Sequence, residues 1–249
     1  MARVRQEIWD EETARRYDTP GTGMFAPEVV EPAVDRLAEL AGGGRVLEFA
    51  IGTGRVAVPL AARGVPVTGI ELSPAMIARL RTKASAAEVP VITGDMATAT
   101  APGRYSLVYL VYNTISNLLT QEAQIACFRN AARHLEPGGR FVLELGVPEL
   151  RTLPPSRDAM VWRNEPGRIG LDTYDVVQQH LVSHHFSFDE DGQAHLARST
   201  HRYIWPAELD LMARLAGLVL ESRHADWVGG EFTAESGSHV SVYRLPASG

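Results

Sequence analysis

The sequence predicts an α/β protein with a central parallel sheet and an inserted antiparallel subdomain. Hydrophobic residues make up 45% of the 249 residues and charged residues 22%, as in soluble globular proteins. From Arg45 to Gly146, short β-branched runs alternate with helical patterns, which is typical of βαβ crossovers. Beyond residue 150, β-compatible runs follow one another directly. We therefore expect a single domain over 1–249 with an insert after its fifth strand.

The first 40 residues are expected to start as a helical segment and to leave the helical pattern at Pro20. They contain no apolar stretch of the kind that a secretory signal needs, and acidic residues interrupt them. The single cysteine, Cys127, cannot form an intramolecular disulfide and is expected to be a small buried apolar residue. These features lead us to expect a cytoplasmic protein.

The core segment, residues 41–150, is expected to hold five strands and four crossover connections. One connection is a helix that begins after Ser73, because serine is a good N-cap and Pro74 suits the first helical position. The expected strands cover residues 45–49, 65–71, 90–95, 105–112 and 139–146.

The segment 151–205 is expected to form the antiparallel insert. Two β-compatible runs, which start at Thr173 and Gln193, flank the Asp- and Gly-containing sequence at 189–192, a pattern typical of a hairpin turn. In the segment 206–249, a helix is expected from Pro206 until Gly217 stops it, followed by two final strands.

A glycine-containing turn follows the first expected strand and precedes a helix. Gly52 and Gly54 allow the backbone to approach a ligand closely and to adopt positive φ. Glu71 ends the second expected strand, where a carboxylate can accept hydrogen bonds from both hydroxyls of an adenosine ribose. Together, the turn and the acid predict an adenosine-containing cofactor.

The same turn is compatible with two cofactors. Gly52, Gly54 and Ala57 satisfy the G-x-G-x-x-[GA] pattern of dinucleotide-binding proteins, which leaves an NAD(P)-dependent oxidoreductase as an alternative. However, the segment from Glu48 to Gly54 resembles the acid-x-G-x-G-x-G motif of class I methyltransferases, with Ala50 in place of the first glycine. This resemblance favours S-adenosylmethionine (SAM).

Two further motifs follow in the order found in class I methyltransferases. The sequence GDM at 94–96 ends the third expected strand, and LEPGGRFVLE at 135–144 resembles the family's turn into its fifth strand. The chain is similar to actinomycete small-molecule methyltransferases such as the aminosugar N,N-dimethyltransferases. The resemblance implies a Rossmann-like seven-stranded sheet, an antiparallel insert after the fifth strand, and SAM as the cofactor.

The resemblance also implies roles for individual residues. Glu71 would hold the ribose, Asp95 and Met96 the adenine, and Tyr17 would fold over the sulfonium from an N-terminal helical lid within residues 1–40. Glu48 would lie near the amino-acid end of the cofactor. The full set of implied cofactor-binding residues is Tyr17, Glu48, Ala50, Gly52, Gly54, Glu71, Leu72, Asp95 and Met96.

Acceptor-binding residues are expected near the carboxyl ends of the strands, where open α/β sheets bind ligands. Tyr112 and Asn113 end the fourth expected strand, and Arg202 and Tyr203 belong to the insert that would roof the pocket. These four residues are the candidate acceptor contacts.

Three residues are candidates for catalysis: Tyr17, His184 and His201. An imidazole near neutral pKa suits the deprotonation of a hydroxyl or an ammonium group. We expect no metal site, although His184 and His201 could share an ion across the hairpin if its register brought them together.

The predicted function is methyl transfer from SAM to an oxygen or nitrogen atom of a small organic acceptor in secondary metabolism. SAM is already activated, so alignment of the reactants is the main task of the protein. The formal net charge of −6 disfavours nucleic acid and membrane surfaces as partners. Besides the oxidoreductase, a second alternative to the methyltransferase is a non-methylating protein of the same fold that binds SAM as a scaffold or cyclase.

Overall fold

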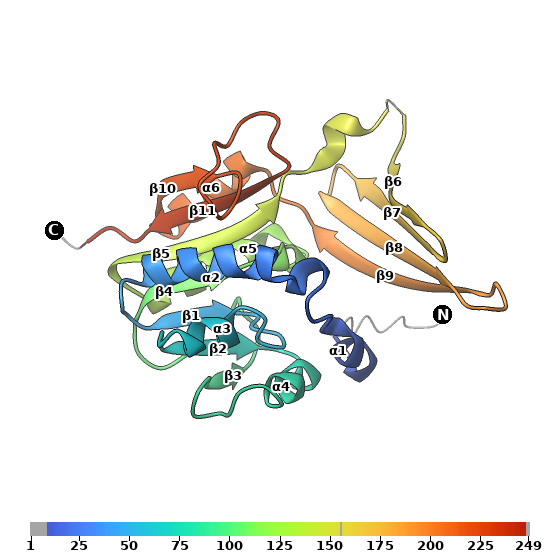
Figure 1. Cartoon of the computed structure of the whole chain (residues 1–249). Coiled ribbons are helices and arrows are strands. Elements are labelled where there is room, and N and C mark those ends of the chain that lie inside the picture. Colours follow the sequence, from blue (N-terminus) through green and yellow to red (C-terminus); the bar gives the residue numbers. More distant parts are fainter. Residues whose placement is uncertain (1–8, 155, 248–249) are drawn as a thin grey trace.

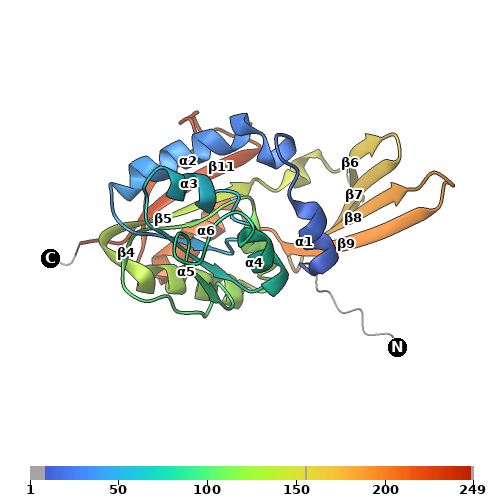
Figure 2. The same cartoon turned by 60° about the horizontal axis from the view of Figure 1, so that its bottom comes forward.

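The computed structural model describes residues 9–154 and 156–247, so part of the expected N-terminal helical segment, residues 1–8, lies outside the described residues. The described chain forms a seven-stranded sheet covered by helices on both faces, and a separate four-stranded antiparallel sheet that projects from one end (Figures 1 and 2). The predicted α/β class and the predicted antiparallel insert are confirmed.

Parallel strands form the middle and one edge of the large sheet. β1 (Val46–Phe49) pairs with β2 (Val67–Glu71) on one side and with β4 (Tyr105–Leu110) on the other. β3 (Val91–Thr93) lies beside β2, and β5 (Leu135–Gly146) lies beside β4. All residues of β1 and β2 are buried, as expected for strands with helices on both faces. The carboxyl ends of these parallel strands meet at one edge of the core.

Two antiparallel strands complete the other edge of the large sheet. β11 (Ser238–Arg244) pairs with β5, and β10 (Val219–His224) pairs with β11. The resulting strand order is β10-β11-β5-β4-β1-β2-β3, which confirms the predicted seven-stranded sheet and its two final strands.

Helices cover both faces of this sheet. α2 (Pro27–Ala41), α3 (Ala57–Ala62) and α4 (Pro74–Leu80) contribute apolar side chains to a buried cluster on one face. α5 (Gln121–His134) and α6 (Pro206–Leu215) pack on a second cluster on the other face. The sheet is therefore sandwiched between two apolar layers, which fixes the strand ends that carry the site.

The predicted helix boundaries near Ser73 and Gly217 are confirmed. The Ser73 side chain accepts a hydrogen bond from the Met76 N–H at 3.2 Å, and Pro74 occupies the first position of α4. Gly217, with φ of +77°, follows the end of α6.

The antiparallel sheet contains four strands rather than one hairpin. The predicted turn at 189–192 is confirmed, since it joins β8 (His180–Phe188) to β9 (Ala194–Arg202). The run that starts at Thr173 is interrupted before β8, where Gln179 has a φ of +56°. Its first residues belong instead to the end of β7 (Arg168–Asp175), which pairs with β6 (Ala159–Glu165).

Four predicted boundaries of the core strands are wrong by two residues or more. The second strand begins at Val67 rather than at residue 65, and the third ends at Thr93 rather than at residue 95. The fourth strand ends at Leu110 rather than at residue 112, because Tyr112 and Asn113 have φ values of +56° and +59°, outside the strand region. The fifth strand begins at Leu135, four residues before Gly139.

The cysteine is buried, as predicted. Cys127 lies on α5, and burial raises the pKa of its thiol well above the usual range, so the group behaves as an apolar side chain. Among the described residues, no helix combines the length and the apolar character that crossing a membrane would need.

Candidate active site

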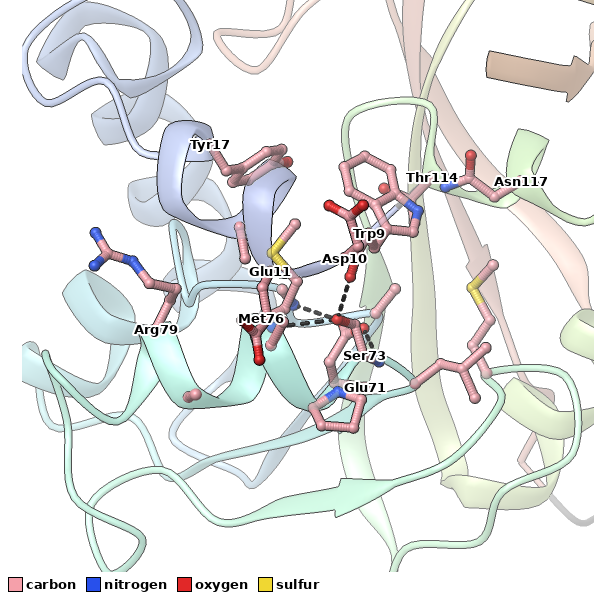
Figure 3. Close-up of a pocket in the computed structure, with 18 of the residues that line it drawn as sticks. Trp9, Asp10, Glu11, Tyr17, Glu71, Ser73, Met76, Arg79, Thr114 and Asn117 are labelled. Carbon is pink, nitrogen blue, oxygen red and sulfur yellow. Dashed lines mark hydrogen bonds between the residues drawn. The ribbon is translucent and has the colours of Figure 1, made fainter. Parts of the chain in front are cut away.

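A cavity of about 1310 Å³ lies at the carboxyl ends of β1, β2 and β3. Its walls come from the turn after β1, the start of α4, the segment after β3 and the 3-10 helix η2 (Thr114–Asn117). Helix α1 (Glu11–Tyr17) covers it, so that Tyr17 and Trp9 lie across from Glu71 and Ser73 (Figure 3). This is the edge at which open α/β sheets bind ligands.

The two glycines of the turn have different surroundings. Gly52 lines the cavity with φ of +57°, and a Cβ there would meet only the Ala50 carbonyl oxygen, at 3.9 Å. Gly54, with φ of +79°, does not line the cavity, and a Cβ there would lie 2.9 Å from Val58 Cγ2 and 3.1 Å from Leu80 Cδ1. Gly52 therefore leaves space for a ligand, whereas Gly54 allows the turn to pack against α4.

Ala50 also adopts a conformation that favours glycine. Its φ is +50°, in the left-handed region, and the residue lines the cavity. For a residue with a Cβ this region costs about 1–2 kcal/mol. The turn thus keeps the backbone of the glycine motif although one of its glycines is replaced.

The Glu71 carboxylate is held in place by two backbone amides. Its Oε2 accepts from the Gly52 N–H and its Oε1 from the Ser73 N–H, both at 2.8 Å. Burial raises the pKa of this carboxyl, and the two amide hydrogen bonds oppose that rise. Each oxygen keeps a lone pair for a further donor, so the group fits a pair of ligand hydroxyls.

Asp95 and Met96 line the cavity after β3, and Leu72 lines it after β2. The Asp95 Oδ1 accepts from the Ala97 N–H at 2.7 Å, so this side chain also caps the segment that follows. The largely exposed Leu72 and the nearly buried Met96 give the cavity apolar surface suited to a flat ring.

Glu48 lies behind the turn and does not line the cavity. It is 3% exposed, and its Oε2 accepts from the Tyr109 hydroxyl at 2.6 Å. Burial raises the pKa of this carboxyl to about 8, against the lowering effects of the Tyr109 hydroxyl and of nearby Arg55. In this arrangement Glu48 supports the turn from behind.

Tyr17 lines the cavity from the last turn of α1. Its ring makes edge-on contacts with Trp9, at 5.6 Å between centroids, and with Phe25, at 5.8 Å. Burial is the main cause that raises the pKa of its hydroxyl, so the group stays protonated at neutral pH.

Tyr112 and Asn113 follow β4 but do not line the cavity. Tyr112 is 46% exposed, and the Arg55 guanidinium lies over its ring, 5.0 Å from the centroid. The Asn113 Oδ1 accepts from the Gly146 N–H at 2.5 Å. These contacts hold two consecutive residues with a left-handed backbone conformation beside the cavity. Such backbone strain is often found at functional sites.

The candidate catalytic histidines lie on opposite faces of the antiparallel sheet. His184 is opposite Arg198, and His201 is opposite Leu181. Positions 198 and 201 on β9 are three residues apart, and this odd spacing places their side chains on opposite faces. The two side chains therefore cannot share an ion across the hairpin. His184 is on the same face as Thr200, which is the cavity-lining residue in the described part of this sheet. The Nδ1 of His184 accepts from Arg198 Nε at 3.3 Å.

Arg202 and Tyr203 are buried outside the cavity. Arg202 is 6% exposed, and its guanidinium donates to Glu208, Gln124 and Gln179. The Tyr203 ring packs against Tyr174 with 6.2 Å between centroids. Here the two residues join the antiparallel sheet to α6 and α5.

The sequence does not indicate that several further residues line the cavity. It marks Ser73 only as a helix cap, yet the Ser73 side chain also donates to the Trp9 carbonyl at 2.6 Å. Asn117 and Thr200 also line the cavity. Their positions depend on how distant segments pack, which motif spacing does not reveal.

Comparisons with known proteins agree with this geometry. A family model described as "Methyltransferase domain" matches residues 46–139. The structure of the CcbJ methyltransferase from Streptomyces caelestis is 40% identical, covers 94% of this chain and 96% of its own, and superposes with a TM-score of 0.84. The cypemycin N-terminal methyltransferase of a Streptomyces species is 29% identical over 92% of this chain and 94% of its own.

A third relative shares the fold at lower identity. It is the SAM-bound amino pentose methyltransferase CalS10 from Micromonospora echinaspora, 20% identical, with a TM-score of 0.68 over 98% of this chain and 99% of its own. The seven-stranded sheet and the cavity at its strand ends define a class I SAM-binding protein. The chain belongs to the SAM-dependent methyltransferases. No comparison favours the oxidoreductase alternative.

Proposed function

We propose that this methyltransferase acts on an amine nitrogen of a small natural product. Among the described residues, the cavity lining includes no histidine and no lysine, and the Tyr17 hydroxyl is protonated at neutral pH. An alcohol or phenol acceptor needs a base in contact with it, whereas an amine can lose its proton to solvent before transfer. The described lining thus offers no imidazole or amine to serve as a base, and this is the observation that carries the proposal.

The charge of the lining supports a cationic acceptor. Its carboxylates outnumber its guanidinium groups, and an excess of negative charge concentrates protonated amines from solution. The net charge of −6 supports a small molecule rather than nucleic acid. The acidic lining residues are Asp10, Glu11, Glu12, Glu71 and Asp95, against Arg15 and Arg79. The cypemycin relative, whose name specifies an N-terminal acceptor, agrees with an amine.

We infer the roles of the cofactor-binding residues from their places in the cavity. Glu71 would accept hydrogen bonds from the ribose hydroxyls, Asp95 would hold the adenine edge, and the open space at Gly52 would take the amino-acid end. When bound, SAM supplies an activated methyl group. Tyr17 closes the cavity over that group and excludes water, so the protein contributes mainly alignment.

Methyl-labelled SAM tests the proposal directly. The purified protein is incubated with an amino sugar, a peptide with a free N-terminus and a catechol, and the products are identified by mass spectrometry. We expect methylation of an amine, at a rate that rises with pH until the free amine predominates. The N-acetylated form of each amine is the control and should stay unmodified. Methylation of hydroxyls alone would overturn the assignment.

We also propose the cytoplasm as the compartment of this enzyme. Its one cysteine is buried and has no partner for an intramolecular disulfide, which suits a reducing environment. Fractionation of the producing cells tests this, and recovery of the enzyme outside the cytoplasm would contradict it.

A further inference from the structure

The C-terminal end of α1 is fixed to the glycine turn by one side chain. Asp18, the C-cap residue of α1, accepts from the Thr53 hydroxyl at 2.5 Å through Oδ1 and from Lys83 Nζ at 2.9 Å through Oδ2. Thr53 lies between Gly52 and Gly54 and is 1% exposed. The Asp18 side chain is itself only 11% exposed. A partly buried carboxylate thus joins the roof of the cavity to the turn beneath it.

The other end of α1 is fixed to the ribose side of the cavity. The Trp9 carbonyl accepts from the Ser73 hydroxyl at 2.6 Å, and the Ser73 N–H donates to Glu71 (Figure 3). The two ends of α1 therefore hold different walls of the same cavity. Tyr17, which lines the cavity, is the residue just before Asp18.

Little else in α1 fixes its position. The helix has seven residues, too few to be stable alone in water, and Ala14 is its one buried residue. Its ion pairs Glu11–Arg15 and Glu12–Arg16 are exposed and lie within the helix. Its seating on the core consequently depends on its two polar connections and on the edge-on ring contacts of Tyr17.

We propose that Asp18 is a positioning residue that seats Tyr17 over the glycine turn and so sets the affinity and residence time of the cofactor. The inference rests on the proposed placement of SAM in this cavity. When the Asp18–Thr53 bond is lost, α1 is seated in a smaller fraction of molecules, and the apparent affinity falls by that fraction. Asp18 does not line the cavity, and it acts through Tyr17, which does.

Two conservative variants separate the Thr53 bond of Asp18 from its ion pair with Lys83. Thr53→Val removes the hydroxyl and keeps the shape of a buried side chain. Lys83→Met removes the closer ion pair and leaves Arg79 Nη2, 3.9 Å from Asp18 Oδ2. The matched control is Asp35→Asn, which breaks an ion pair between α2 and Arg63, the C-cap residue of α3, away from the cavity. Each protein is titrated with SAM and with S-adenosylhomocysteine by calorimetry, and the dissociation rate is measured by stopped flow.

For Thr53→Val we expect about tenfold weaker binding, or about 1.4 kcal/mol, and faster dissociation of S-adenosylhomocysteine. Faster hydrogen exchange of α1 in the ligand-free protein should accompany it. For Lys83→Met we expect a smaller loss of affinity. Added salt should abolish this loss, because the Asp18–Lys83 ion pair is partly exposed. The control should match the wild type. Once an acceptor is known, KM for SAM should rise more than kcat falls.

Unchanged affinity and dissociation rate in Thr53→Val would overturn the role of Asp18. The proposed cofactor placement fails separately: it falls if replacement of Glu71 leaves SAM binding intact. An unfolded Thr53→Val protein is recognised by its circular dichroism. In that case Asp18→Asn, which keeps an oxygen for Thr53 and loses the charge, decides: tighter or equal binding contradicts the proposal, and weaker binding supports it.

Discussion

Replacement of Glu48 by glutamine should change how the stability of this methyltransferase depends on pH. Glu48 is fully enclosed behind the glycine turn, and burial raises the pKa of its carboxyl to about 8 from the usual 4.5. The folded state therefore binds this proton more tightly than the unfolded state does. Glutamine has the same shape, keeps an oxygen for the Tyr109 hydroxyl and has no proton to lose.

The size of the effect follows from the two pKa values. Below pH 4.5 the carboxyl is protonated in both states, and its titration does not affect the free energy of unfolding. Between 4.5 and 8, stability falls by about 1.4 kcal/mol per pH unit, and above 8 the loss levels off at about 5 kcal/mol. Between pH 5 and pH 8 the wild type should therefore lose about 3.5 kcal/mol that the variant retains.

Urea denaturation from pH 5 to pH 8.5 measures the free energy of unfolding of the wild type and of Glu48→Gln. Because the other titrating groups are the same in both proteins, their effects cancel in the difference. The control is Glu190→Gln, at an exposed turn position, which should run parallel to the wild type. Parallel curves for the wild type and Glu48→Gln would refute the reasoning, because Glu48 would then titrate alike in both states.

Two further pairs of variants test the packing of the turn and of the antiparallel sheet by the same denaturation assay. Ala50→Gly should stabilise the protein by up to about 1 kcal/mol, because the strain relieved at a φ of +50° exceeds the entropic cost of the added glycine. A loss of stability would contradict this. Gly54→Ala should destabilise it by more than about 2 kcal/mol, because the new Cβ meets Val58 at 2.9 Å. Arg202→Met should cost about 3–5 kcal/mol by leaving Glu208 without its buried partner, whereas the exposed Arg244→Met should cost less than about 1 kcal/mol. Similar losses in the two variants would count against the role of Arg202 in joining the antiparallel sheet to α6.

Much of the fold could be predicted because local patterns determine it. The β-branched runs around β1 and β2 are buried on both faces, and Ser73 with Pro74 begins α4 as its cap chemistry predicts. The β6 strand was missed because most of its residues are exposed and lack an apolar alternation. The end of β4 was misplaced because nothing in the sequence reveals that Tyr112 adopts positive φ.

The site was predictable where a residue's role depends on its place at a strand end. Gly52, Glu71, Asp95 and Met96 all line the cavity, as the strand ends led us to expect, although their contacts with SAM remain a proposal. Arg202 differs, since its guanidinium forms an ion pair with Glu208 on α6 instead of facing the cavity. Which charged side chains face a ligand and which face each other depends on tertiary packing.

Calorimetry of SAM with the wild type and Glu71→Gln tests the central proposal most directly. The carboxylate accepts from two backbone amides and has lone pairs left for two ribose hydroxyls, whereas glutamine would turn its NH₂ toward one of those amides. With about 1.5–3 kcal/mol for each charged hydrogen bond, we expect an affinity loss of about 100-fold or more. Equal affinity in the two proteins would contradict the assignment of Glu71 to the ribose.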